Sequence, residues 1–167
     1  MKKAILPLIF FFGLAIRFLF FPQNIYFGYD QARDAFNALG ILQGHLKLIG
    51  PTSSIAGLNH GALYYYLIAP AYLIGHGDPA SLSVFLRILN CLGVFIIYFL
   101  TNILFKNKRM ALIAAVLFAV SFEQSQFALY MGNPSPASIT IMLMYLGLAL
   151  VIFGKKQWGL ILAAFFL

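Results

Sequence analysis

The residues best suited to chemistry are two aspartates, Asp30 and Asp34, in the stretch Tyr29-Asp30-Gln31-Ala32-Arg33-Asp34. The chain has only four acidic residues among 167. On a helix, a spacing of four places both carboxylates on one face, where their repulsion raises the pKa of one unless Arg33 offsets it. Such a carboxylate can act as a general base toward an acceptor hydroxyl or amine. Asp30 is also suited to a structural role as the N-cap of a helix.

Three more polar residues lie in or beside apolar segments. His60, between Asn59 and Gly61, can bind phosphate, a metal ion or a substrate hydroxyl, or can be an ordinary polar loop residue. Arg87 lies near one end of an apolar segment, so it either reaches toward lipid headgroups or binds an anionic lipid phosphate inside a helix bundle. For Arg17 the sequence favours a structural ion pair with a loop acid.

The composition indicates an integral membrane protein built from helices. Hydrophobic residues make up 62% of the chain and charged residues only 9%, whereas ordinary soluble domains carry about 25% charged residues. The net charge of +7 comes from short basic clusters between apolar runs, which membrane topology explains better than a nucleic-acid-binding face does. The single cysteine excludes a disulfide framework within the chain.

The apolar runs predict an all-α bundle of membrane-spanning helices. Spans are expected at 4–21, 82–105, 110–127, 139–153 and 157–167. The last run is about half of the roughly 20 residues that a span needs, so residues 1–167 are interpreted as the N-terminal part of a longer transmembrane catalytic domain. Segment 61–75 is short, begins and ends with glycine and contains Pro70, which is typical of a re-entrant or juxtamembrane piece.

The distribution of charge predicts the orientation. If 61–75 does not span, the cytoplasmic side receives the basic clusters and no acid; these are Lys2, Lys3, Lys106, Lys108, Arg109, Lys155 and Lys156. If 61–75 spans, every basic cluster after the first lies outside, against the positive-inside rule. The N-terminus is therefore expected in the cytoplasm of a cell whose plasma or inner membrane holds the protein, with 22–81 as a large external loop.

The external loop is expected to be ordered. Apolar residues recur at helical spacing between residues 30 and 43, with polar residues between them, which predicts an amphipathic helix on the membrane surface. Tyr64, Tyr65 and Tyr66 are suited to the headgroup level. The loop therefore looks built to shape a site at the outer interface.

The order of these motifs resembles the GT-C superfamily of membrane glycosyltransferases. The points of similarity are the Asp30 stretch, Asn59-His60-Gly61-Ala62-Leu63-Tyr64-Tyr65-Tyr66, Arg87 at the start of the second spanning helix, and Asn133-Pro134 in the second external loop. The chain looks closest to family-39-like bacterial enzymes, which are related to protein O-mannosyltransferases and aminoarabinose transferases.

The resemblance implies an inverting hexosyl or pentosyl transferase that takes its sugar from a polyprenyl-phosphate donor at the external membrane face. Asp30 matches the essential aspartate, and Asp34 is a second candidate catalytic acid. The candidate substrate-binding residues are Arg33, His60, Tyr64, Tyr65, Arg87 and Asn133. The acceptor would be a lipid, a glycan or a protein, with no nucleic acid as partner. Where some relatives carry metal-binding acids in the second external loop, this chain has the neutral Asn133, so no metal or other cofactor is expected, although a divalent metal stays possible.

Two other functions fit a membrane protein of this kind. A transporter or flippase for polyprenyl lipids would need no chemistry, but transporters usually bind substrate near the bilayer midplane, whereas the polar residues here gather at the outer interface. A non-catalytic assembly protein is the third interpretation. The fragment alone is expected to be inactive.

Overall fold

The computed structural model describes residues 4–55 and 57–166. It is 67% helical, and the described ranges contain no β-strand. The helices are α1 (Ile5–Arg17), α2 (Tyr29–Leu42), α3 (Leu63–Ile74), α4 (Pro79–Cys91), α5 (Gly93–Phe105), α6 (Lys108–Val120), α7 (Phe122–Leu129), α8 (Ala137–Ile152) and α9 (Gly159–Phe165). The predicted all-helical class is therefore confirmed.

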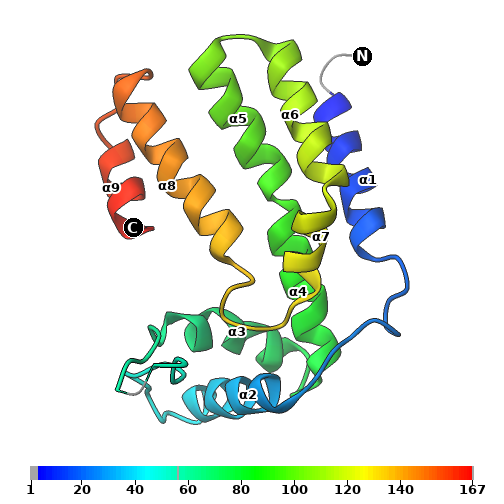
Figure 1. Ribbon diagram of the computed structural model, residues 1–167, viewed down its shortest axis with the longest axis vertical. Coiled ribbons are helices and arrows are strands. Elements are labelled where there is room, and N and C mark those ends of the chain that lie inside the picture. Colours follow the sequence, from blue (N-terminus) through cyan, green and yellow to red (C-terminus); the bar gives the residue numbers. More distant parts are fainter. Residues whose placement is uncertain (1–3, 56, 167) are drawn as a thin grey trace.

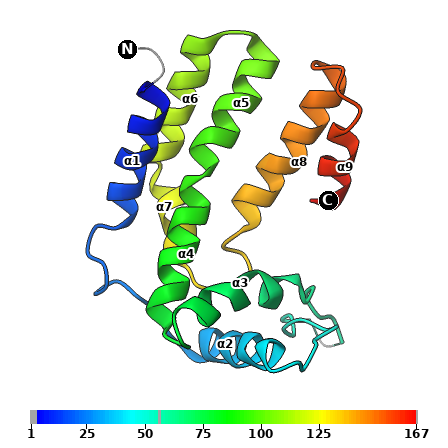
Figure 2. The same ribbon diagram turned by 180° about the vertical axis from the view of Figure 1, so that it is seen from behind.

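The helices form an upright bundle with two helices lying across one end. Helices α1, α4, α5, α6 and α8 run roughly along the long axis, while α2 and α3 cross beneath them (Figures 1 and 2). Helix α5 packs against α6 and α8, α1 packs against α6, and α2 packs against α3. One apolar core lies within the bundle, and a second lies where α2, α3 and α4 meet. The crossing pair therefore has packing of its own and is not a loose loop.

One described helix is long and apolar enough to cross a membrane. It runs from Pro79 to Phe105, through α4 and α5, and covers the predicted span at 82–105. The expected span at 110–127 is instead broken: α6 and α7 meet at a bend of 52° and would count as a span only together. The first helix also ends early, at Arg17 rather than residue 21, and α8 and α9 have 16 and 7 residues.

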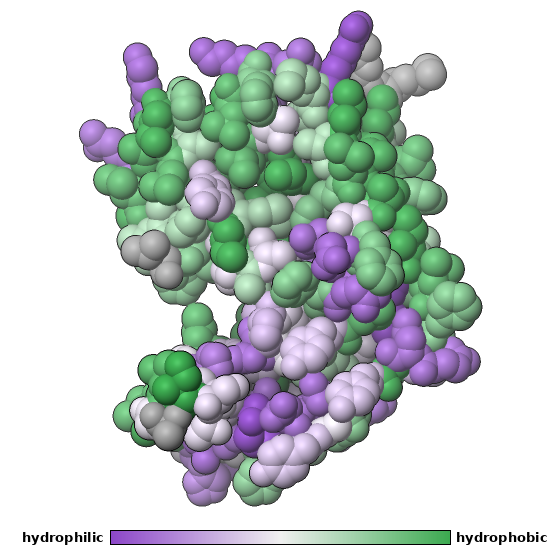
Figure 3. Space-filling model, viewed as in Figure 1, coloured by the Kyte–Doolittle hydropathy of each residue, from purple (hydrophilic) through white to green (hydrophobic). Residues whose placement is uncertain are grey.

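Basic and acidic segments lie at opposite ends of the molecule. The α5–α6 and α8–α9 connections, which carry Lys106, Lys155 and Lys156, stand at the end away from α2 and α3 (Figure 1). Helix α2 carries Asp30 and Asp34 at the other end. The space-filling view shows a largely apolar band between two polar ends (Figure 3).

Arg17 binds backbone carbonyls at the end of α6. Its side chain is 1% exposed, and its Nη1 donates to the carbonyl of Ala119 at 3.0 Å, close to the end of α6. Helix α7 begins directly after α6. Ser121 between them has an extended backbone, and its Oγ accepts a hydrogen bond from the Gln124 amide as the N-cap of α7. Arg17 Nε also donates to Asn90 Oδ1 at 2.8 Å. The predicted ion pair of Arg17 with a loop acid is thus wrong: its partners are carbonyls and an amide.

Arg87 is the second buried arginine at this level. It is fully buried, and its Nη1 donates to the backbone carbonyl of Arg17, the last residue of α1. Its Nη2 donates to Asn24 Oδ1 at 2.7 Å, and its guanidinium lies 4.9 Å from the ring centroid of Phe21. Arg87 thereby fixes the end of α1 and the strap that leads to α2. An arginine placed this way stabilises through directed donors and aromatic contact, without a carboxylate.

Replacement of Arg17 by methionine should destabilise the protein by about 3 kcal/mol, because several buried acceptors lose a charged donor at once. Cys91, the chain's single cysteine, is fully buried, so its reaction with a fluorogenic maleimide during heating reports unfolding. Arg109→Met, the same change at an exposed position, serves as the control and should leave the melting temperature nearly unchanged. Equal melting temperatures for the two variants would show that Arg17 does not hold the α6–α7 bend.

Candidate functional site

Helix α2 holds the acidic residues of the candidate site. Its N-cap is Gly28 and not Asp30, which corrects the structural alternative for that residue; the Gly28 amide donates to Gln31 Oε1 at 3.1 Å. The helix is amphipathic as expected, with Ala35 and Ala38 packed against α3 and the second core. Asp30 therefore stands in the first turn of α2, where an acid interacts favourably with the helix dipole, and its carboxylate is free of the capping role.

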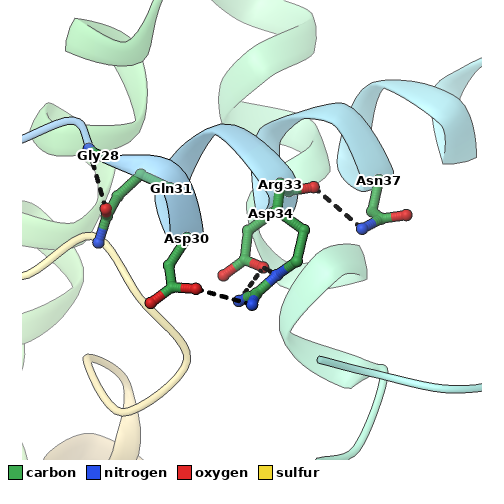
Figure 4. Close-up of polar contacts among 6 residues, drawn as sticks. All are labelled: Gly28, Asp30, Gln31, Arg33, Asp34 and Asn37. Carbon is green, nitrogen blue, oxygen red and sulfur yellow. Dashed lines mark hydrogen bonds and ion pairs between the residues drawn. The ribbon is translucent and has the colours of Figure 1, made fainter. Parts of the chain in front are cut away.

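Arg33 joins the two aspartates (Figure 4). Its Nη1 lies 2.8 Å from Asp30 Oδ1, while its Nη2 and Nε lie 2.8 and 2.9 Å from Asp34 Oδ1. The side chains of Asp30 and Asp34 are 58% and 2% exposed, so one acid is open to solvent and the other is buried. Both carboxylates contact Arg33, whose positive charge offsets the repulsion between them.

The surroundings of Asp34 come from α3. Burial raises the pKa of the Asp34 carboxyl; the ion pair with Arg33 opposes this shift, and the charge of Asp30 adds to it. Burial, with the Asp34 charge as a second cause, raises the pKa of Tyr72 to about 12 and raises that of Tyr64 as well. Among the described residues, neither tyrosine hydroxyl has a hydrogen-bond partner. Asp34 thus lies in a mostly apolar pocket of aromatic residues, with Arg33 as its cation.

Three predicted substrate-binding residues line a single cavity of about 580 Å³. His60, Tyr64 and Asn133 come from the loop before α3, from α3 and from the segment before α8. The rest of the lining is mainly apolar and includes Leu63, Leu67, Phe165 and Phe166. A cavity with an apolar wall and a few polar groups suits an amphipathic ligand.

Arg33 and Tyr65 line a second, more polar cavity of about 470 Å³. Tyr65 is 2% exposed. Burial raises the pKa of its hydroxyl, the Asp34 charge raises it further, and the neighbouring Arg33 and Asn37 lower it. Tyr64 and Tyr65 are adjacent on α3 but border different cavities, so α3 separates the two spaces.

Arg87 lies apart from these residues. It lines neither cavity, and its donors go to Ser83, Asn24 and the carbonyl of Arg17. Within this structure it belongs to the packing between α1 and α4. Binding of a phosphate by Arg87 stays a prediction, and it would require Arg87 to give up these hydrogen bonds.

Sequence reasoning missed several residues around the site. Tyr72 lies two helical turns after Tyr65 on the same face of α3, and Asn37 lies one turn after Arg33 on α2, donating to the Arg33 carbonyl at 3.0 Å. Both follow from helical spacing once the helices are assigned. Lys47, which borders the polar cavity, stands in a loop and carries no such signal.

Within residues 4–55 and 57–166, no three His, Cys, Asp or Glu side chains gather closely enough to hold a metal ion. No protein family model, no curated protein and no solved structure matches the chain.

Replacement of Arg33 by methionine should lower the free energy of unfolding by about 3 kcal/mol, because it leaves the Asp34 carboxylate buried without its cation. Asp34→Asn should have a much smaller effect, since Arg33 keeps Asp30 as a partner. The double variant should therefore recover most of the loss, as measured by denaturant titration in detergent micelles. Additive losses in the double variant would contradict the assignment of Arg33 as the charge partner of Asp34.

Proposed function

We propose that this chain is the membrane part of an inverting glycosyltransferase. It would move a hexose or pentose from a polyprenyl-phosphate donor to an acceptor at the external face of the plasma or inner membrane. The observation that carries the proposal is the Asp30–Arg33–Asp34 arrangement, which pairs an exposed acid with a buried one on a helix that crosses the bundle end. The similarity of the sequence motifs to GT-C enzymes supplies the reaction class.

Insertion in a membrane is part of the proposal. It is supported by large apolar side chains exposed on the bundle, among them Phe11 at 63%, Leu117 at 62% and Ile161 at 75%. Lipid tails can cover such a surface, whereas water cannot do so without a large free-energy cost. The placement of the basic connections opposite α2 and α3 supports an orientation with those connections in the cytoplasm.

In the proposed reaction, Asp30 is the catalytic base. The acceptor hydroxyl oxygen attacks the anomeric carbon, Asp30 takes the hydroxyl proton, and the bond from that carbon to the phosphate oxygen breaks. Polyprenyl phosphate leaves with the electron pair. Asp34 is assigned as a positioning residue, because it is 2% exposed and its Oδ1 accepts from two nitrogens of Arg33.

The apolar cavity beside α3 is assigned to the donor lipid. Its lining is mainly apolar, as prenyl units require, and His60, Asn133 and Thr140 offer polar contacts for the headgroup. Tyr64 and Tyr66 border this cavity on the α3 side.

Asp30→Asn in the complete natural protein should reduce sugar transfer about 10²–10⁴-fold, because the acceptor hydroxyl loses its base. The measurement is transfer of radiolabelled sugar from a polyprenyl-phosphate donor in isolated membranes. Asp78→Asn is the matched control, since Asp78 only caps α4 through the amide of Ala80 and asparagine caps as well. Unchanged transfer by Asp30→Asn would refute the catalytic role and favour a lipid transporter or an assembly protein.

Cysteine labelling tests the orientation independently of activity. In a Cys91→Ser background, Ser54→Cys should react with a membrane-impermeant maleimide on intact cells, because Ser54 lies in the exposed loop between α2 and α3. Gln157→Cys, at the opposite end beside Lys155 and Lys156, should react only after the membrane is opened. Labelling in the reverse order would refute the external location of the acidic site.

A further inference from the structure

A cavity between α7 and the strap that joins α1 to α2 (residues 18–28) lies outside the candidate site. Its volume of about 410 Å³ falls within the range of about 300–1,000 Å³ typical of small-molecule sites. One wall comes from α7, which packs against α4 near the crossing helices (Figure 1). The other wall comes from the strap. Two segments far apart in the sequence thus enclose one space.

One face of α7 supplies most of the lining. Its contributions are Glu123, Gln126, Phe127 and the C-cap residue Tyr130. These positions are spaced i, i+3, i+4 and i+7, and such residues lie on one side of a helix. The hydroxyl of Ser135 donates to the Phe127 carbonyl at 2.7 Å and fixes the last turn. The helix therefore presents a carboxylate, an amide and two aromatic rings to the same space.

The strap presents Asn24 and Tyr26 from the opposite side. Asn24 is held at both ends of its amide: Oδ1 accepts from Arg87 Nη2 at 2.7 Å, and Nδ2 donates to the Leu19 carbonyl at 2.9 Å. The Asn24 amide is thus engaged within the protein, and the strap beside the cavity is fixed before any ligand binds. A preformed wall lowers the entropy lost on binding.

The rings of Tyr26 and Tyr130 each fold back onto a glycine. A Cβ atom on Gly28 would lie 2.7 Å from the Tyr26 hydroxyl oxygen, and one on Gly132 would lie 2.5 Å from Cε1 of Tyr130. The missing Cβ atoms therefore leave the room that each ring occupies. Tyr26 is 67% exposed and Tyr130 is 45% exposed, so part of each ring stays open to a ligand.

The lining carries one formal charge, and this charge is negative. Within residues 4–55 and 57–166, the ion pairs are those of Arg33, so the exposed Glu123 carboxylate has no cationic partner there. No described lysine, arginine or histidine lines the cavity. Arg87 reaches the back of the wall through Asn24, but it is fully buried and outside the lining. The cavity therefore favours a cation.

The remaining groups indicate which cation fits. A divalent metal ion takes several oxygen ligands, usually with more than one carboxylate, whereas this cavity has a single acid. Aromatic rings attract organic ammonium groups through their negative faces. A primary ammonium also has three N–H donors, which carboxylate, amide and phenol oxygens can accept. Both kinds of group are present in the lining.

We propose that this cavity binds a small primary ammonium group, with Glu123 as its counter-ion and the Gln126 amide oxygen as a second acceptor. The rings of Tyr26 and Tyr130 contact the adjoining carbon atoms. The amine belongs either to a lipid headgroup or to a soluble molecule. The inference does not rest on the proposed sugar transfer. A purely structural alternative for Glu123 is its place in the first turn of α7, where an acid interacts favourably with the helix dipole.

Saturation-transfer NMR on the complete natural protein in maltoside micelles tests the binding. The probe is ethanolamine at millimolar concentration and neutral pH. Ethylene glycol, with a hydroxyl in place of the ammonium, is the neutral control, and choline is the control without N–H donors. Ethanolamine should show transfer to its methylene protons, ethylene glycol should show none, and choline should bind several-fold more weakly. Absence of transfer to ethanolamine, or equal binding of either control, would overturn the proposal.

Two variants connect the signal to the cavity. Glu123→Gln should weaken ethanolamine binding by about tenfold or more, because the ammonium loses its charged acceptor. Asp78→Asn is the matched acid-to-amide control outside the lining and should bind as the natural protein does. Tyr26→Leu should weaken binding about 2–5-fold, and Tyr29→Leu, at an exposed ring outside the lining, is its control. If Glu123→Gln lowers the melting temperature but leaves binding unchanged, Glu123 serves only the helix and the proposal is refuted.

Competition separates the two sources of the amine. Dihexanoyl phosphatidylethanolamine and dihexanoyl phosphatidylglycerol are added to the ethanolamine complex in parallel. Displacement by the phosphatidylethanolamine alone assigns the cavity to a lipid headgroup, and displacement by neither assigns it to a soluble amine. Equal displacement by both lipids would overturn the proposal, because binding would then not depend on the ammonium. A protein that binds ethanolamine but transfers no sugar would refute the proposed function and leave this site in place.

Discussion

The described part of the chain depends on two buried guanidinium groups that bind helix ends instead of carboxylates. Arg17 holds carbonyls at the end of α6, and Arg87 holds the carbonyl of Arg17 at the end of α1. A guanidinium presents five donors in a fixed fork, so it can serve several carbonyls and amides at once. Helices α1 and α6 therefore stop at the same level, and the chain is free there to turn toward α2 and α7. The crossing helices α2 and α3 then pack against each other and against α4 in a core of their own.

Hydropathy patterns predicted the helices that depend mainly on residues close together in the sequence. The amphipathic helix expected over 30–43 is observed at Tyr29–Leu42, and the apolar run at 82–105 lies inside a continuous helix. The bend after Val120 was missed because hydropathy averages over it, although Ser121 followed three residues later by Gln124 is a capping pattern. The early end of α1 had no local signal, since it depends on Arg87, which lies 70 positions further along the chain.

The candidate site shows the same division between local and distant information. Spacing along one helix was enough to place Asp30, Arg33 and Asp34 together. The burial of Asp34 was not predictable from α2, because it depends on how α2 packs against α3, whose Tyr64 and Tyr72 feel the charge of Asp34. Likewise, His60 and Asn133 share a cavity although 73 positions separate them in the sequence. The resemblance to GT-C enzymes named both as candidate substrate-binding residues, but nothing in their spacing along the chain indicated a shared cavity.

The different exposure of the two aspartates gives them different chemical capacities. A general base must reach its substrate and must also be held in a defined orientation. Asp30 is exposed, and Arg33 orients it; Arg33 is in turn held by Asp34, whose burial restricts the motion of the whole group. Helix α3 completes the arrangement, with Tyr64 toward the apolar cavity and Tyr65 toward the polar one. Arg33 lines the polar cavity and contacts Asp30, so it links the packing of that side of α3 to the orientation of the proposed base.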